Sequence, residues 1–254
     1  MAAVAVSRPA SKAPPVTQRL YPEAKAIGFP LNAHRFRLYS IVNALVRPTD
    51  LVLDFGAGRG RWEEGGYLGE VTNIRQRCLG LYGFDVDPIV HENDSVDITT
   101  HARVGERLPY RDGQFHVILS HAAFEHIEDP AFYARELSRV LAPGGWLVAW
   151  TPSRYGYVAM GASLVPNRLH AKVLRATGNT DREAHDVFPT CYRLNSKAAL
   201  RRHFPGWQDY SFYAAGPPGY HGERLWLARI IQAANWALPG PLKPYLFVVM
   251  RKPS

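Results

Sequence analysis

The sequence has little cysteine and no long apolar run, and each shortage excludes a class of protein. Its 254 residues include two cysteines, Cys78 and Cys191, which lie far apart and outside any Cys-x-x-Cys motif. They argue against a disulfide framework and a zinc ribbon, and they fit a reducing cytosol. No stretch approaches the roughly 18 to 20 uninterrupted apolar residues that a membrane-spanning helix needs. We therefore expect a cytoplasmic protein.

The first 19 residues lack the pattern of a folded element. Their longest apolar segment, 2–6, has five residues, fewer than the roughly 7 to 15 of a signal-peptide core. Proline, alanine and serine are frequent, and this composition predicts a flexible tail over 1–19. Residues 20–254 remain as one domain.

Acidic residues are outnumbered, at 22 against 30 lysines and arginines, which leaves a formal net charge of +8. A basic chain suits a nucleic acid, an anionic membrane surface or a phosphorylated substrate. However, there is no RNP-type aromatic motif and no run of five or six basic residues. The charge therefore leaves each of these partners open, together with a plain solvated basic surface.

Strand-like and helix-like segments alternate along the chain. Short runs rich in branched apolar residues predict strands, which cover 51–55, 81–87, 113–120, 146–151, 209–215 and 245–251. Apolar spacing and capping residues predict helices, which cover 31–46, a start at 60–64, 130–142 ended by Pro143-Gly144-Gly145, 166–177, 195–203 and 223–237. This alternation predicts an α/β fold, with a seven-stranded, mostly parallel sheet and helices on both faces.

The segment LVLDFGAGRGRW (51–62) joins a buried strand to a glycine-rich turn. Gly56 and Gly58 fit the dinucleotide fingerprint Gly-x-Gly-x-x-Gly, but Arg61 stands at the third glycine position and Gly60 comes one residue early. A pyrophosphate site is therefore the weaker interpretation. The bare backbone and the N–H groups at a helix start still favour an anion such as a carboxylate.

Two acids at strand ends suit the two halves of one ligand. Asp54 at the end of the first strand would organise a cationic amino group. Asp85 at the end of the second would accept hydrogen bonds from both ribose hydroxyls. S-adenosylmethionine joins an amino acid to an adenosine and fits this description. The glycines alone would also fit a tight turn in another α/β enzyme.

Residues 105–153 carry further motifs in a fixed order, namely ERLPY, FHVILS, FEH and RVLAPGG. With the glycine turn and Asp85, these motifs resemble those of class I S-adenosylmethionine-dependent methyltransferases of the small-molecule (type 11-like) group. The resemblance covers roughly 50–153 and implies a Rossmann-like sheet whose cofactor is S-adenosylmethionine. It makes 50–153 the cofactor-binding half and 154–254 the acceptor-side elaboration.

The resemblance implies roles for the glycine turn and the second strand. Gly56, Gly58 and Gly60 correspond to the loop beneath the methionine end of the cofactor. Asp85 corresponds to the ribose ligand, and Val86 lies beside the adenine.

The adenine side shows one departure from the pattern. Val104 stands where an acid often lies near the adenine amino group. We expect backbone groups around Gly105 and Glu106 to make that contact instead, and we place Ser120, at the end of its strand, among the cofactor-binding residues with Asp54.

Two histidines are candidate catalytic bases. A hydroxyl acceptor must lose its proton as it attacks, and imidazole suits this task at neutral pH. Ligands of open α/β sheets bind at the carboxyl edge, which His121 reaches just after Ser120. His126 lies one turn further on, where the family's Glu-His pair often braces a loop, so we favour His121.

We predict no metal site. In ubiquinone-type O-methyltransferases, a Glu followed three residues later by a Glu-His pair can hold a divalent ion. Here the pair is Glu125-His126 and the earlier position is Ala122. Without that carboxylate, the site suits a hard cation poorly.

The acceptor is less defined by the sequence. VPNRLH and HDVFPTCYRLNSKAALRRHF are similar to segments of bacterial members found with polysaccharide and glycoconjugate genes, which favours a small-molecule or glycan acceptor, most simply a hydroxyl. A cofactor-binding protein without transfer activity is the alternative. An RNA methyltransferase is disfavoured because SHAA stands where amino methyltransferases of bases carry Asn/Asp-Pro-Pro-Tyr/Phe.

The segment 223–238 is apolar on more than one face and carries Trp226 and Trp236. Packing in the core or in a dimer is the simpler interpretation. Peripheral membrane contact, which would make the protein membrane-peripheral rather than freely cytoplasmic, is the other.

Overall fold

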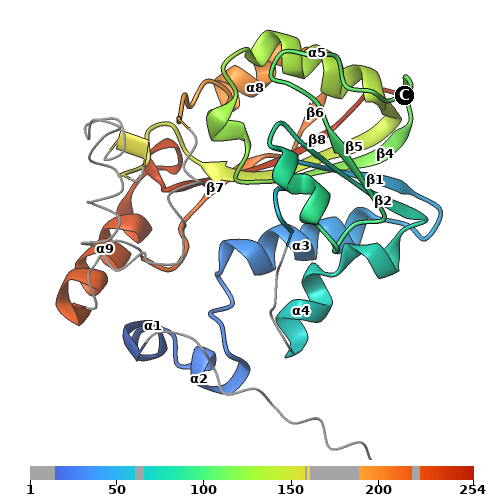
Figure 1. Ribbon diagram of the computed structural model, residues 1–254. Coiled ribbons are helices and arrows are strands. Elements are labelled where there is room, and N and C mark those ends of the chain that lie inside the picture. The colour runs from blue at the N-terminus through green and yellow to red at the C-terminus, as the bar shows by residue number, and fades with distance from the viewer. Residues whose placement is uncertain (1–14, 61–65, 158, 161–188, 219–223) are drawn as a thin grey trace, which may run out of the picture.

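The computed structural model describes residues 15–60, 66–157, 159–160, 189–218 and 224–254 (Figure 1). The strands are β1 (Leu51–Phe55), β2 (Gly80–Asp85), β3 (Ile98–His101), β4 (Phe115–His121), β5 (Leu141–Pro152), β6 (Gln208–Asp209), β7 (Phe212–Ala214) and β8 (Tyr245–Arg251). The helices are α1 (Pro15–Leu20), α2 (Glu23–Ile27), α3 (His34–Leu45), α4 (Gly66–Thr72), α5 (Pro130–Val140), α8 (Lys197–His203) and α9 (Leu225–Ala237). Short 3-10 turns are η1 (Ile74–Arg77), η2 (Pro88–Glu92), η3 (Phe124–His126) and η5 (Gly240–Leu242).

The strands form one sheet in the order β3-β2-β1-β4-β5-β8-β6, and β7 also pairs with β8. From β3 to β5 all neighbours are parallel, whereas β8 runs antiparallel to β5 and to both outer segments. Because β6 and β7 pair with the same edge of β8, the eight strands fill seven positions. This confirms the predicted mostly parallel α/β sheet.

Two apolar cores sandwich the sheet, because successive side chains of a strand point to opposite faces. On one face Val52, Val117 and Val148 pack with α3. On the other face the neighbouring side chains of the same strands pack with α5 and α8. Figure 1 shows α3 and α4 on one side of the sheet and α5 and α8 on the other.

Helix α5 begins as its capping residues predict. The Asp129 side chain accepts a hydrogen bond from the Phe132 N–H at 2.9 Å, and Pro130 occupies the first turn. The helix ends at Val140, because Leu141 already pairs with Phe115 in the sheet. The predicted stop at 143–145 was therefore too late, and β5 starts five residues before the predicted strand at 146–151.

Other boundaries also differ from the prediction. Residues 15–19 of the expected flexible tail belong to α1, where Val16 is buried. The predicted strand at 209–215 is interrupted between β6 and β7. Gly60 has a positive φ of +75° rather than a helical one. The rest of that predicted helix start, 61–64, and the predicted helix at 166–177 lie outside the described residues.

Candidate cofactor site at the carboxyl edge

The glycine turn after β1 depends on positive φ values at Gly56 (+82°), Gly58 (+52°) and Gly60 (+75°). Residues that carry a side chain rarely adopt these φ values, so the turn requires glycine at these positions. The N–H groups of Gly56 and Ala57 both donate to the carbonyl of Phe84, at 2.8 and 3.0 Å, and tie the turn to the end of β2. A Cβ at Gly56 would lie 2.3 Å from the side chain of Ala123.

Asp85 faces the glycine turn from the end of β2. Its Oδ2 accepts a hydrogen bond from the Gly58 N–H at 2.8 Å, and its Oδ1 accepts one from the Asp87 N–H at 3.0 Å. Burial raises the pKa of Asp85, while these N–H groups favour the charged form. Within the described part of the chain, a Cβ at Gly58 would come within 4 Å of Asp85 Oδ2 alone, at 4.0 Å. Gly58 and Asp85 thus frame an open cradle that any larger side chain would begin to fill.

Asp54 is the most perturbed acid of the site. Burial, and secondarily the charge of Asp85, raise its pKa to about 7. It lines a cavity of about 1050 Å³ together with Tyr39, Leu119 and residues of α4. A cationic group that approaches this carboxyl group would lower its pKa and so favour its charged form.

Asn93 is a site residue that the sequence analysis missed. Its buried Nδ2 donates to the carbonyls of Ala57 and Gly58, both at 3.2 Å. Its Oδ1 accepts from the N–H and the hydroxyl of Ser95. A single asparagine in a loop belongs to no recognisable motif, so the sequence gives no signal for Asn93, although its hydrogen bonds hold the glycine turn in place.

Val86 and Glu106 lie past the ends of β2 and β3. Val86 is half-buried, and its carbonyl accepts a hydrogen bond from Nε2 of His101 at 3.2 Å. Glu106 is exposed, and its carboxylate accepts from the Arg103 N–H at 3.0 Å. The N–H of Gly105 donates to the Tyr133 hydroxyl at 3.3 Å. The expected adenine contacts therefore lie on loops beside the Asp85 end of the site.

Ser120 occupies a different position from the other predicted cofactor residues. It is fully buried, and its hydroxyl donates to the carbonyl of Phe55 at 2.8 Å. The side chain holds the ends of β1 and β4 together and does not reach the open surface of the site. In the structure Ser120 therefore holds the ends of two strands together, and its direct contact with the cofactor stays a prediction.

His121 belongs to an aromatic cluster at the carboxyl edge of the sheet. Its ring stacks on Trp150 of β5, with centroids 5.0 Å apart. His34, the first residue of α3, stacks more closely on Trp150, at 3.9 Å, and lies 5.5 Å from His121. Tyr245 closes the cluster, 5.1 Å from Trp150. The sequence pattern did not indicate His34, because nothing near 34 marks it as close to residues 121 and 150.

The residue after His121 is held in an unusual backbone conformation. Ala122 has a positive φ of +58°, and its N–H donates to the carbonyl of Trp150 at 2.9 Å. Non-glycine residues with positive φ are strained and concentrate at functional sites. The chain therefore turns sharply where β4 leaves the sheet, directly beside the glycine turn.

Glu125 and His126 brace the loop after η3. The buried carboxylate of Glu125 accepts from the Thr151 hydroxyl at 2.7 Å, and the Glu125 carbonyl accepts from the N–H groups of Cys191 and Tyr192. Nδ1 of His126 donates to the carbonyl of Pro189 at 2.9 Å. These contacts fit the role of bracing a loop, which the sequence analysis gave as the alternative to a catalytic role for His126. Among the described residues, no group of three or more His, Cys, Asp or Glu side chains could hold a metal ion.

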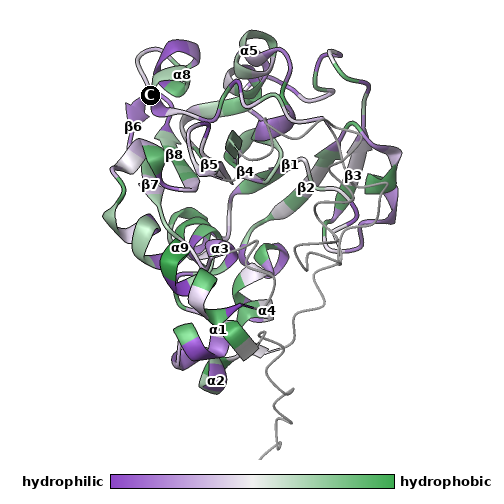
Figure 2. Cartoon of the chain, turned by 90° about the vertical axis from the view of Figure 1, so that its left-hand side faces the viewer, coloured by the Kyte–Doolittle hydropathy of each residue, from purple (hydrophilic) through white to green (hydrophobic). Residues whose placement is uncertain are grey.

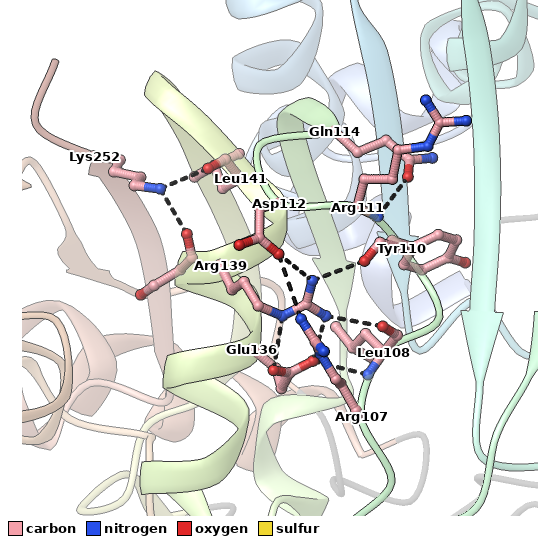
Figure 3. A network of polar contacts seen from close by, with 11 residues as sticks. Arg107, Leu108, Tyr110, Arg111, Asp112, Gln114, Glu136, Arg139, Leu141 and Lys252 are labelled. Atoms are coloured by element: carbon pink, nitrogen blue, oxygen red, sulfur yellow. Dashed lines mark hydrogen bonds and ion pairs between the residues drawn. The ribbon is translucent and has the colours of Figure 1, made fainter.

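A polar network fixes the segment that follows the predicted adenine loop (Figure 3). Arg139 of α5 donates to the carbonyls of Leu108 and Tyr110, at 2.9 and 2.7 Å, and pairs with Glu136 at 2.6 Å and Asp112 at 2.8 Å. Glu136 in turn accepts from the Leu108 N–H at 2.9 Å. Both backbone groups of Leu108 are thus held by α5. This is the physical role of the arginine in the RVLAPGG motif.

Comparisons with known proteins agree with this geometry. Residues 53–149 match the family described as methyltransferase domain. A Mycolicibacterium smegmatis protein named as a probable S-adenosylmethionine-dependent methyltransferase is 31% identical over 133 residues, which cover 51% of this chain and 48% of that protein. The chain therefore spans about half the length of this curated relative.

Solved structures share the fold at low identity. An S-adenosylmethionine-dependent methyltransferase from Mesorhizobium loti is 18% identical, with 87% of this chain and 98% of that chain covered and a TM-score of 0.52. One from Methanosarcina mazei is 13% identical, with 84% and 97% covered and a TM-score of 0.51. Residues 53–149 thus match the methyltransferase domain family, on a Rossmann-like fold shared with S-adenosylmethionine-dependent methyltransferases.

Proposed function

We propose that this protein transfers a methyl group from S-adenosylmethionine to a hydroxyl group of a small molecule or glycan. The observation that carries the proposal is the cradle between Gly58 and Asp85 at the carboxyl edge of the sheet. The match of residues 53–149 to the methyltransferase domain family supports the same reading.

The residues at hand suit the two ends of this cofactor. Asp85 presents two carboxylate oxygens beside a bare glycine backbone, which suits the paired hydroxyls of a ribose. Asp54 lies one strand away with a pKa of about 7, and a cationic amino group would stabilise its charged form. Asn93 keeps the turn between them in place.

When bound, the cofactor would supply an electrophilic methyl group on a sulfonium, and transfer of that group to the acceptor oxygen would leave the electron pair of the broken carbon–sulfur bond on sulfur. The hydroxyl proton must leave in the same event, and we assign it to His121, which ends β4 at this edge. The stacked rings of Trp150 and His34 hold that imidazole in one orientation and exclude water.

The acceptor class rests on the chain after β5. The similarity of 185–204 to segments of polysaccharide-associated methyltransferases favours a glycan or a related small molecule. In the structure the start of this region is tied to the site by the bonds of Glu125 to Cys191 and Tyr192. These bonds support our assignment of the residues from 189 onward to the acceptor side.

Isothermal titration with S-adenosylhomocysteine tests the cofactor assignment. We expect wild type to bind with micromolar affinity and Asp85→Asn to lose about tenfold or more, or ~1.4 kcal/mol per decade. Glu128→Gln is the matched control, because Glu128 is an exposed acid that does not line the cavity of Asp54. Absence of binding by wild type would overturn the proposal.

Transfer of labelled methyl groups to a panel of sugars and phenols then separates an enzyme from a cofactor-binding protein without activity. Transfer to any hydroxyl acceptor supports the proposal. Tight binding of S-adenosylhomocysteine without methyl transfer to any acceptor of the panel, or to any component of a lysate of the cells that produce the protein, favours the non-catalytic alternative.

A further inference from the structure

Helix α9 exposes an apolar stripe on the surface. Its members share one side of the helix because their spacing of three and four residues repeats the helical period, and they are Trp226, Ile230, Ala233 and Ala237. Trp236 borders this stripe, with Arg229 on the same side. We call these six residues the α9 face.

The large side chains of the α9 face are unusually open to solvent. The exposed fractions are 61% for Trp226, 57% for Ile230 and 86% for Trp236. The opposite side of the helix is anchored, because Ala228 and Asn235 are buried. Figure 2 shows α9 as a largely hydrophobic helix at the surface of the molecule, above α1 and α2.

The charge within helix α9 is of one sign. Helix α9 contains no acidic residue, and its exposed charges are Arg229 and, just before the first turn, Arg224. The whole chain carries a formal net charge of +8. An anionic surface would attract this protein at long range and would not be repelled by α9 at contact.

We propose that the α9 face docks on an anionic membrane surface. The helix is too short to cross a bilayer, and no helix that the structure describes could span one. A helix lying flat needs an apolar stripe flanked by cations, with tryptophans whose rings sit at headgroup level. Trp226 and Trp236 stand near the two ends of α9 and meet this requirement. The proposal is independent of the methyltransferase assignment.

Vesicle flotation tests this docking with two lipid compositions. We expect wild type to float with vesicles of phosphatidylcholine and phosphatidylglycerol, and to stay behind with phosphatidylcholine alone. Added salt should weaken the binding, because exposed charges are screened. The double variant Trp226→Ala/Trp236→Ala should lose about tenfold or more in partitioning, since two large apolar side chains no longer enter the interface.

Matched variants separate docking from general effects. Leu79→Ala removes an apolar side chain that is 68% exposed elsewhere, and Arg202→Gln removes an exposed cation of α8; both should float like wild type. Arg229→Gln should reduce flotation on anionic vesicles only. Unchanged thermal unfolding of the double variant would show that the loss is not one of folding.

Two results would overturn the proposal. One is flotation of the double variant equal to that of wild type, and the other is no flotation of wild type with either kind of vesicle. The second result can be taken further by size-exclusion chromatography, which would detect a concentration-dependent dimer that the double variant abolishes. That result would assign the α9 face to a second copy of the chain.

Discussion

The side chain of Asn93 occupies the space that a side chain at Gly60 would need: a Cβ on Gly60 would lie 1.9 Å from Oδ1 of Asn93. Asn93 cannot swing away without losing its bonds to the carbonyls of Ala57 and Gly58. We expect Gly60→Ala to cost about 1–3 kcal/mol of unfolding free energy, because the backbone there has positive φ, and to weaken S-adenosylhomocysteine binding.

The pair makes a double-mutant cycle. Asn93→Ala removes the clash but also the support of the turn, so the double variant should be less impaired than the sum of the two single variants. Urea unfolding and titration calorimetry measure both quantities. Strict additivity would show that the two positions do not share this space.

Asp54 should make cofactor binding depend on pH. Its pKa is about 7 in the folded chain, and an ammonium group placed beside it would lower that value. Binding of S-adenosylhomocysteine should therefore release protons below pH 7, and the affinity should fall as the solution is acidified. Calorimetry in buffers of different ionisation enthalpy measures this release. Asp54→Asn should bind more weakly, without that pH dependence; an unchanged profile would assign the proton elsewhere.

The same residue should affect stability with a defined sign. Because burial raises the folded pKa of Asp54 above its ordinary value of 3.8, the contribution to stability is fully present below pH 3.8 and is lost as the pH rises through about 7. Urea unfolding of Asp54→Asn should thus show a gain over wild type above pH 7 that vanishes in acid. A constant difference across this range would contradict the assignment.

Arg139→Met should be among the most destabilising single substitutions at the edge of α5. It leaves the carboxylate of Glu136, whose side chain is 11% exposed, without its partner, at a cost of about 3–5 kcal/mol. Arg135→Met is the matched control, since Arg135 is exposed on the same helix and should change stability by about 0.5 kcal/mol or less.

The Arg139 network should also depend on pH. Bonding to Arg139 lowers the pKa of Glu136 below its ordinary 4.5, so its stabilisation is present above that value and is lost as the pH falls through the lowered one. Arg139→Met should therefore lose less stability than wild type on acidification. Parallel acid unfolding curves would show that Glu136 is not the group involved.

Ser120→Ala distinguishes positioning from contact. The substitution leaves the carbonyl of Phe55 without its donor, which should cost about 1–3 kcal/mol of stability. Affinity for S-adenosylhomocysteine should stay within about twofold, because the hydroxyl is fully buried. A tenfold loss of affinity at equal stability would restore the direct contact that the sequence suggested.

His121→Gln tests the proposed base once a hydroxyl acceptor is found. The variant should bind S-adenosylhomocysteine like wild type but transfer the methyl group about 10²–10⁴ times more slowly. His126→Gln is the matched control, because Nδ1 of His126 is bound to Pro189. Equal rates for wild type and His121→Gln would remove His121 from the mechanism.

Elements with a strong local pattern could be predicted from the sequence. The strands β1 and β8 have the predicted bounds, because each is an apolar run that ends at polar or turn residues. The helices α1, α2 and α4 and the strand β3 were not predicted. The strand β3 reads Ile-Thr-Thr-His and is largely exposed, so it lacks a buried pattern. The helix α4 contains Gly66 and Gly69, which lower helix propensity.

The candidate site divides in the same way. Gly58 and Asp85 could be singled out from motif spacing, because Gly58 lies in the turn after β1 and Asp85 is the last residue of β2. Asn93 and His34 could not be singled out in this way. Their contacts join residues that are far apart in the sequence, and only tertiary packing brings those residues together. Ser120 lies near the end of β4, where the motif predicts it, but the hydrogen bond from its hydroxyl to the carbonyl of Phe55 could not be read from the order of the motifs.

Both outer edges of the sheet are short, and this limits aggregation. One edge is β3 with four residues, and the other is split into β6 with two and β7 with three. A foreign strand needs a continuous row of free backbone groups to add to a sheet. At the break between β6 and β7, the N–H of Tyr210 donates to the carbonyl of Val249, and the N–H of Val249 donates to the hydroxyl of Ser211. Neither edge therefore offers a long template on which misfolded chains could grow.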